Sequence, residues 1–125
     1  MIEPQAAKHF RWDAMPLETL KGSITRRMIT GDSMMIAEIR LGKGEIVPMH
    51  HHHNEQITYI TSGALKFRLG EAQLEEVIVR AGEVLVIPSN TPHSAEALED
   101  TIDIDIFSPP RQDWLDGTDS YIRKG

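Results

Sequence analysis

The sequence predicts an all-β fold, an antiparallel barrel or sandwich with little helix. Its apolar runs have the length of strands and are rich in isoleucine, valine, threonine and aromatic residues. Turn residues separate these runs at intervals of roughly 8 to 12 positions, which is typical of small barrels and sandwiches. Intervals of this length argue against βαβ units, whose parallel strands need long crossover connections.

Eight runs are expected to form the strands. In chain order they are SITRRMI (23–29), SMMIAEIRL (33–41), EQITYIT (55–61), ALKFRL (64–69), LEEVIV (74–79), EVLVIP (83–88), HSAEAL (93–98) and TIDIDIF (101–107). The breaks between them contain glycine, asparagine, aspartate, serine and proline, each of which favours a turn. The N-terminal segment is expected to be loop-like, and one helical turn is expected near PPRQDWL at 109–115.

The composition bounds the class of protein. A chain of 125 residues with a hydrophobic fraction of 40% and a charged fraction of 26% is typical of one soluble globular domain. The formal net charge of -6 and the lack of a basic stripe argue against nucleic acid or an anionic membrane as partner. No apolar run approaches the roughly 18 residues of a membrane helix, and no apolar signal core is visible, so a cytoplasmic location is expected. Without cysteine, a metal site must use histidine, carboxylate or amide ligands.

Four consecutive histidines interrupt the stretch PMHHHHNEQITYI at 48–60. Residues two apart on a strand share a face, so His50 and His52 would point to one side, and His51 and His53 to the other. Two imidazoles on one face of a strand edge could form half of a metal site. The alternation alone does not say which pair belongs to it.

The surroundings of the histidines select the pair. From Gly44 the chain reads GEIVPMHHHHNEQITYITSG, which resembles the first signature of the cupin superfamily, G-x5-H-x-H-x3-[E/Q]-x6-G. The match runs through Gly44, His50, His52, Gln56 and Gly63. All of its spacings hold only with His50 and His52, so His51 and His53 are interpreted as surface residues or, at most, as residues that support a ligand.

A second signature follows about 20 residues later. The stretch GEVLVIPSNTPHSAEA is similar to the cupin pattern G-x5-P-x-G-x2-H-x3-N through Gly82, Pro88 and His93. Asn90 stands at the motif glycine, and Ala97 replaces the final asparagine. Asparagine also tolerates the left-handed backbone conformation that glycine usually supplies, so the first departure is mild.

The resemblance to cupins implies four metal ligands, His50, His52, Gln56 and His93. Three imidazoles and one side-chain oxygen suit a divalent transition metal such as Ni, Zn, Mn or Fe. The usual fourth cupin ligand is glutamate, and Glu55 lies next to Gln56 in the sequence. Strand alternation points Glu55 to the opposite face and favours Gln56, while a supporting role for Glu55 stays open.

The stretch DTIDIDIFSPPRQDWL alternates strictly. One face carries three isoleucines, and the other carries Asp103, Asp105 and Phe107. The acidic face could be solvated, as is common for a half-buried strand, or it could line a barrel interior. The isoleucines Ile102, Ile104 and Ile106 could pack in the core or across a dimer. Arg111, just beyond the strand, could be an exposed loop residue or could hold a carboxylate by two parallel hydrogen bonds.

From about 44 to 115 the chain resembles KdgF-type cupins of pectin and alginate breakdown, most specifically in the string D-x-F-S-P-P-R. This resemblance implies a single cupin domain over 1–125, a jelly-roll β-barrel (double-stranded β-helix) that binds a divalent metal and forms a homodimer. It also implies catalytic roles for Asp105, Phe107 and Arg111. The implied substrate is a small anionic sugar acid.

The expected function is therefore metal-dependent isomerase chemistry. KdgF-type cupins open 4,5-unsaturated monouronates to linear 4-deoxy-5-keto uronates, and the resemblance implies the same reaction here. Cupins host other functions, so an iron- or manganese-dependent dioxygenase and a non-catalytic small-molecule-binding protein stay open. A dioxygenase would consume oxygen, whereas a binding protein would show affinity without turnover.

Overall fold

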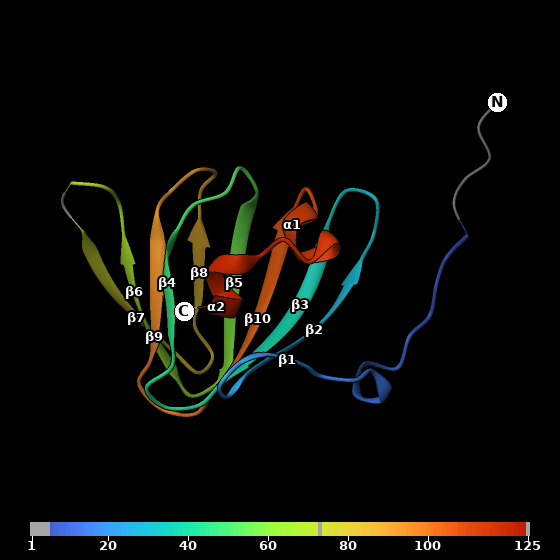
Figure 1. The fold of residues 1–125 in the computed structure, drawn as a ribbon, viewed down its shortest axis with the longest axis horizontal. Helices are drawn as coiled ribbons and strands as arrows, with labels where there is room; N and C mark the ends of the chain where they lie inside the picture. The colour runs from blue at the N-terminus through green and yellow to red at the C-terminus, as the bar shows by residue number, and fades with distance from the viewer. Residues whose placement is uncertain (1–5, 73, 125) are drawn as a thin grey trace.

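Two antiparallel sheets form the body of the computed structural model, which describes residues 6–72 and 74–124 (Figure 1). The larger sheet has the order β1-β2-β3-β10-β5-β8 and the smaller one the order β4-β9-β6-β7. The strands are β1 (Glu18–Lys21), β2 (Ile24–Thr30), β3 (Met35–Leu41), β4 (Ile46–His50), β5 (Glu55–Ser62), β6 (Ala64–Leu69), β7 (Glu75–Arg80), β8 (Val84–Ile87), β9 (His93–Ala97) and β10 (Thr101–Ser108). Within the described residues, three short helical segments complete the fold, η1 (Trp12–Ala14), α1 (Gln112–Asp116) and α2 (Ser120–Lys124). The predicted all-β fold with little helix is confirmed.

The core lies between the two sheets and is built by alternating side chains. In β3, for example, Met35, Ala37, Ile39 and Leu41 are buried, while Ile36 faces outward. Residues of the smaller sheet join the same apolar cluster, among them Leu65, Phe67, Val79 and Ala95. Burying one large aliphatic or aromatic side chain stabilises the fold by about 1.5–3 kcal/mol. The alternation therefore both forms the strands and fixes which faces meet.

All eight predicted strands are present as β2, β3 and β5 to β10, but the sequence did not indicate β1, β4 or α2. β1 has only four residues and a mostly polar sequence, ETLK. β4 contains Pro48, which a strand tolerates at a sheet edge or a bulge. It is an edge strand, and its register with β9 shifts between Val47 and His50.

Two turn residues of the signatures have backbone conformations that explain their identity. Gly63 has a φ of +88°, and a Cβ placed there would collide with Asp100 and Thr101. Asn90, at the position of the motif glycine, has a φ of +62°. Asparagine is one of the few residues that adopt this left-handed region at modest cost. The expectation for Asn90 is confirmed.

β10 turns its acidic face inward. Asp103, Asp105 and Phe107 are buried, whereas the alternating isoleucines are only partly covered. The alternative in which the acidic face of this strand is solvated is therefore wrong. The alternative in which its isoleucines pack in the core is wrong as well. On the outer face of the larger sheet the isoleucines have apolar neighbours that are 38% to 57% exposed, namely Ile36, Ile57, Tyr59, Val84 and Val86.

The C-terminal segment closes the opening between the sheets. α2 contacts β1, at one edge of the larger sheet, and β4, at one edge of the smaller sheet. Trp114 and Ile122 belong to the core cluster. Asp119 accepts a hydrogen bond of 2.8 Å from Arg26, and both side chains are at most 1% exposed. Because breaking a buried ion pair typically costs about 3–5 kcal/mol, this pair locks the segment onto β2.

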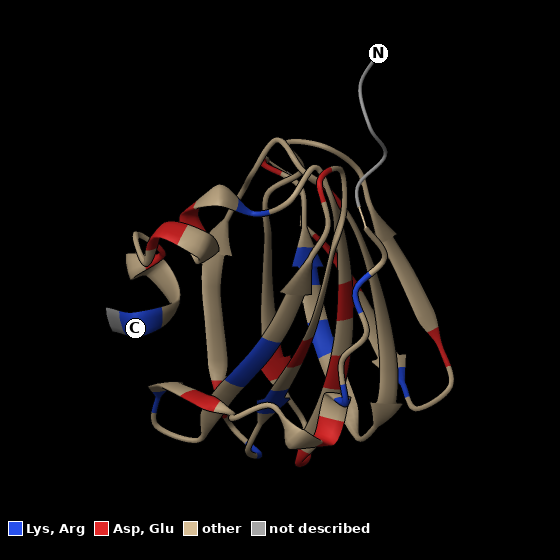
Figure 2. Ribbon diagram, turned by 90° about the vertical axis from the view of Figure 1, so that its right-hand side faces the viewer, with Lys and Arg blue, Asp and Glu red and all other residues tan. Residues whose placement is uncertain are grey.

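Positions of basic and acidic residues are interleaved along the ribbon (Figure 2). No basic stripe stands out in that view. Among the described residues, no helix is both long and apolar enough to cross a membrane.

Candidate metal centre

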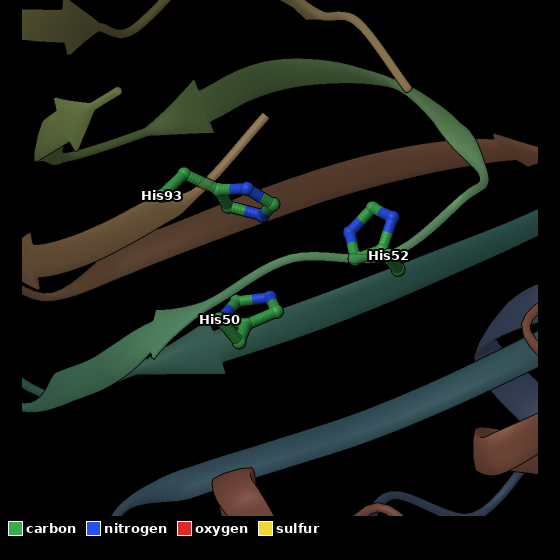
Figure 3. Close-up of side chains that lie close together, drawn as sticks. All are labelled: His50, His52 and His93. Carbon is green, nitrogen blue, oxygen red and sulfur yellow. The ribbon is translucent and has the colours of Figure 1, made fainter. Parts of the chain in front are cut away.

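Three histidines from two parts of the chain meet at one end of the barrel. His50 ends β4, His52 lies two residues beyond it in a loop, and His93 begins β9. One ring nitrogen of each lies within 4.8 Å of one ring nitrogen of each of the others. Figure 3 shows the three rings arranged around a common space. His52 lies outside the strand, yet the spacing of two still places it on the side of His50.

Backbone carbonyls determine which ring nitrogen carries the proton in all three histidines. Each Nδ1 lies within hydrogen-bond distance of a carbonyl oxygen two residues away: Pro48 at 2.8 Å for His50, Asn54 at 3.0 Å for His52 and Thr91 at 2.8 Å for His93. A neutral imidazole has one N–H, and here Nδ1 donates it to the carbonyl. The Nε2 lone pairs are then free to bind a metal.

Gln56 presents its amide oxygen to the same space. Its Nε2 donates to Thr58 Oγ1 at 2.9 Å, which leaves Oε1 3.2 Å from His52 Nε2. Both of these atoms are acceptors when His52 donates through Nδ1, so their proximity favours a cation between them. Two ligand atoms about 2.1 Å from one ion lie about 3.0 Å apart at a right angle and about 3.4 Å apart at a tetrahedral angle. The neighbouring Glu55 is exposed on the opposite face.

The electrostatics keep these histidines neutral. Burial, aided by the nearby His93, lowers the pKa of His50 to about 3. Burial and the charge of Arg111 lower the pKa of His52 to about 4, and the same two causes lower the pKa of His93. Metal ligands must be deprotonated, so the three imidazoles are ready to bind a divalent ion at neutral pH. The donor set of three imidazoles and one amide oxygen fits a divalent transition metal.

Asp105 lies at the end of a hydrogen-bond chain that begins at Gln56. Thr58 Oγ1 receives the Gln56 hydrogen bond and donates its own to Asp105 Oδ1 at 2.7 Å. Asp105 is 3% exposed, and burial raises its pKa. The acidic face of β10 thus lines the barrel interior, and Asp105 lies directly behind the candidate ligands.

Asp103 is a second buried carboxyl group, to which the sequence assigned no role. Burial and the adjacent Asp105 raise its pKa well above the usual range. Its Oδ1 is buried and has no hydrogen-bond partner among the described residues. Both carboxyl groups line a cavity of about 40 Å³, the inner cavity, together with His50, Gln56 and His93. The sequence signal for this position was the strict alternation of β10, which places Asp103 on the same face as Asp105.

Arg111 is buried rather than exposed, at 2%. Its Nε and Nη2 donate to the two carboxylate oxygens of Asp113 at 3.0 and 2.9 Å, and Nη2 also donates to Tyr121 Oη at 2.9 Å. The guanidinium carbon lies 5.1 Å from the ring centre of Phe107 and 4.7 Å from that of Trp114. Burial opposes this charge, but Tyr121 and Asp113 raise the pKa of Arg111 above its usual range. The two guanidinium nitrogens that could bind a substrate carboxylate already bind the carboxylate of Asp113.

Phe107 forms part of the wall beside the histidines. It is 1% exposed, and its ring meets that of His52 edge-on at 5.7 Å between ring centres. The ring of Trp114 also meets it edge-on, with 4.9 Å between ring centres. It lines the inner cavity together with Asp105.

Asn54 and Tyr121 are site residues that the sequence did not reveal. Asn54 Nδ2 donates to the carbonyl oxygens of Pro109 and Pro110 at 2.6 and 3.1 Å, which ties the histidine loop to the turn before Arg111. Tyr121 stacks on His50 with ring centres 4.3 Å apart. Neither residue belongs to a recognisable pattern, so no sequence signal announced them.

A wider outer pocket of about 270 Å³ opens on the solvent side. Its lining consists of residues 50–54, 111–113 and Tyr121, and it includes the exposed His51 and His53. His50, Arg111 and Tyr121 line both spaces and form the wall between them. The inner cavity has room for water molecules, while the outer pocket approaches the size of small-molecule sites.

The fold and the centre define a small β-barrel protein with a possible three-histidine metal site. The chain belongs to the cupin family, because residues 37–108 match the model of the cupin domain. KdgF from Halomonas sp. is 28% identical over 88% of this chain and 100% of its own, with a TM-score of 0.80. A RmlC-like cupin from Shewanella frigidimarina is 25% identical over 86% and 96%, with a TM-score of 0.78. Oxalate decarboxylase of Bacillus subtilis is 20% identical over 86% of this chain and 31% of its own, with a TM-score of 0.74, and shares the fold.

Proposed function

We propose that this cupin is a metal-dependent enzyme that opens 4,5-unsaturated monouronates, products of pectin or alginate breakdown, to linear 4-deoxy-5-keto uronates. One observation carries the proposal: a buried carboxyl group, Asp105, lies one hydroxyl away from a candidate metal ligand, in a cavity that Arg111 also lines. The likeness to KdgF supports the same reaction.

His50, His52, Gln56 and His93 would hold the divalent ion. The bound ion would supply positive charge for the oxygen that becomes negative as the ring opens. Because Gln56 is neutral, it leaves more of that charge available than the glutamate usual in cupins would. The sugar would lie where the inner cavity meets the outer pocket.

The reaction needs a proton to move but no net acid or base. The C1 hydroxyl loses its proton, the C1–O5 bond breaks, and the electron pair leaves with O5 as an enolate on C5. A proton must then reach C4 to give the 5-keto product. Asp105 would take the hydroxyl proton and return it to C4, while Thr58 holds its carboxyl group in place.

The substrate carboxylate would be attracted by Arg111. Since Nε and Nη2 are bound to Asp113, the group left to meet an anion is Nη1, for which no hydrogen bond is present among the described residues. Phe107 would keep water from the reacting carbons by forming the apolar wall.

The test follows the loss of ultraviolet absorbance of the C4–C5 double bond. Asp105→Asn should slow turnover by about 10²–10⁴-fold, the usual contribution of general acid–base catalysis, with the bound metal retained. Undiminished turnover by the metal-loaded variant would remove Asp105 from the mechanism. Rates should be equal with and without air, because no oxidation occurs. Oxygen consumption would instead indicate a dioxygenase, and substrate affinity without turnover would indicate a binding protein.

A further inference from the structure

The ring of Tyr121, from the C-terminal helix α2, lies flat against the ring of His50. The ring centres are 4.3 Å apart, and the planes are inclined by 27°. On another side His93 approaches the same imidazole at 4.3 Å between ring centres, with an inclination of 58°. His50 is therefore enclosed by two rings, one from another candidate ligand and one from a residue with no assigned role.

His50 needs this support more than a residue in the middle of a sheet would. It is the last residue of the edge strand β4, and the register of β4 with β9 shifts just before it. The one hydrogen bond of its side chain among the described residues runs from Nδ1 to the carbonyl of Pro48. That bond fixes which nitrogen carries the proton but leaves the ring free to tilt about it. A flat aromatic neighbour removes this freedom.

Tyr121 is itself held rigidly. Arg111 Nη2 and Trp114 Nε1 both donate to its Oη at 2.9 Å. The next residue, Ile122, is 2% exposed in the core, and the buried pair of Arg26 and Asp119 anchors the start of α2. A tyrosine fixed by two donors and a buried backbone is a firm support and not a mobile flap.

We propose that Tyr121 is a positioning residue of the metal centre, which holds the His50 imidazole in the orientation that directs Nε2 toward the ion. The C-terminal segment thereby completes a centre whose ligands all precede residue 94. Tyr121 lies beyond residues 37–108, the stretch that matches the cupin domain. The inference rests on the proposed metal site but not on the proposed reaction.

Residues that orient a ligand without touching the metal change affinity measurably, and their loss typically costs about 10- to 100-fold. Tyr121→Phe loses the two hydrogen bonds to the hydroxyl but keeps the flat ring, which the buried backbone of α2 still holds against His50, so it should bind metal nearly as well as the wild type. Tyr121→Leu fills the space with a flexible side chain and should weaken binding by about 10- to 100-fold. Tyr59→Leu makes the same change on the exposed outer face of β5 and serves as the matched control.

Calorimetric titration with Zn²⁺ measures the affinity of the three variants and the wild type, and the Co²⁺ absorption spectrum reports the coordination number. We expect Tyr121→Leu alone to bind weakly and to show a changed Co²⁺ spectrum. A Kd of folded Tyr121→Leu equal to that of Tyr59→Leu would overturn the proposal. If Tyr121→Leu does not fold, NMR of the metal-free wild type provides the test. The inference requires contacts between the ring protons of Tyr121 and His50, and their absence contradicts it.

These outcomes separate the inference from the proposed function. Weak metal binding by Tyr121→Leu supports the positioning role even if the wild type does not open unsaturated uronates. Normal metal binding by that variant contradicts the role even if the wild type turns them over rapidly.

Discussion

Asp113 holds the guanidinium group of Arg111 with both carboxylate oxygens, at 3.0 and 2.9 Å. The arginine that the sequence offered as an anchor for a substrate carboxylate therefore has an internal carboxylate in its fork. Asp113 and Tyr121 keep Arg111 in one orientation, and the three aromatic rings of Phe107, Trp114 and Tyr121 surround it. Asp113 therefore has two opposing effects on the binding of an anion. It holds Arg111 in one orientation, and its negative charge cancels part of the attraction of Arg111 for the anion.

Replacing Asp113 by Asn tests which effect dominates. The amide oxygen can still accept one hydrogen bond from Arg111, while one negative charge is removed from the outer pocket. Asp113 is 35% exposed, so water screens its charge, and we expect KM for the uronate to fall only about two- to fivefold. Asp116→Asn, the same change one helical turn later, is the control and should leave KM unchanged. A higher KM for Asp113→Asn would show that fixing the orientation of Arg111 matters more for substrate binding than removing the negative charge of Asp113.

Gln56 and Glu55 form a matched pair for assigning the fourth ligand. Gln56→Leu removes the oxygen that faces His52 Nε2, whereas Glu55→Leu changes an exposed side chain on the opposite face. We expect only the first to weaken Zn²⁺ binding, by at least about tenfold. Gln56→Glu should bind the metal more tightly and attract the anionic substrate less, since it adds a negative charge to the centre. Weak binding by Glu55→Leu alone would reverse the assignment.

The depressed pKa values of the histidines predict how the metal-free protein responds to acid. With a pKa of about 3 for His50 and about 4 for His52 in the folded chain, against about 6.5 when unfolded, the unfolded state binds more protons below pH 6.5. Stability should therefore fall as the pH drops, by up to about 1.4 kcal/mol per pH unit for each such histidine. Thermal unfolding from pH 7 to pH 5 with a chelator measures the slope. His50→Ala should reduce it, and His53→Ala, which changes an exposed histidine of the same run, should not.

Asp103 predicts the opposite dependence on pH. Its pKa is raised in the folded protein, so the folded state retains a proton that the unfolded state loses above about pH 4. This contribution to stability is complete below that pH and is lost as the pH rises toward the raised pKa. Asp103→Asn cannot ionise, and in metal-free protein its advantage over the wild type should grow with pH. Asp32→Asn, in an exposed turn, should show no such trend, and a constant difference for Asp103→Asn would argue against a buried acid.

The sequence predicted the parts of this molecule that are local and periodic. Strand alternation and the two signatures placed His50, His52, Gln56 and His93, because those positions depend on spacing along one or two strands. The partners of Arg111 could not be predicted in the same way. Tyr121 reaches the centre through a short helix held by a pair between Arg26 and Asp119, residues 93 positions apart. Such contacts depend on how the C-terminal segment crosses the opening between the sheets, which no repeat or motif encodes.

We propose the outer face of the larger sheet as the interface of the expected homodimer. Ile106 of β10 lies between Ile36 of β3 and Ile57 of β5, and Ile57 is paired with Val86 of the edge strand β8. These side chains carry no charge, so two copies of the chain can meet there without bringing like charges into direct contact.

A charge on this face should therefore separate the dimer. Light scattering after size exclusion should find the wild type as a dimer and Val86→Lys as a monomer, because burying an unpaired ammonium group is costly. Ile78→Lys places the same charge on an exposed apolar position of β7 in the smaller sheet and should leave the dimer intact. A monomeric wild type would refute the dimer itself. Ile78 and Val86 have similar exposure, 43% and 53%, but belong to different sheets. Dissociation by Ile78→Lys but not by Val86→Lys would therefore show that the interface lies on the smaller sheet.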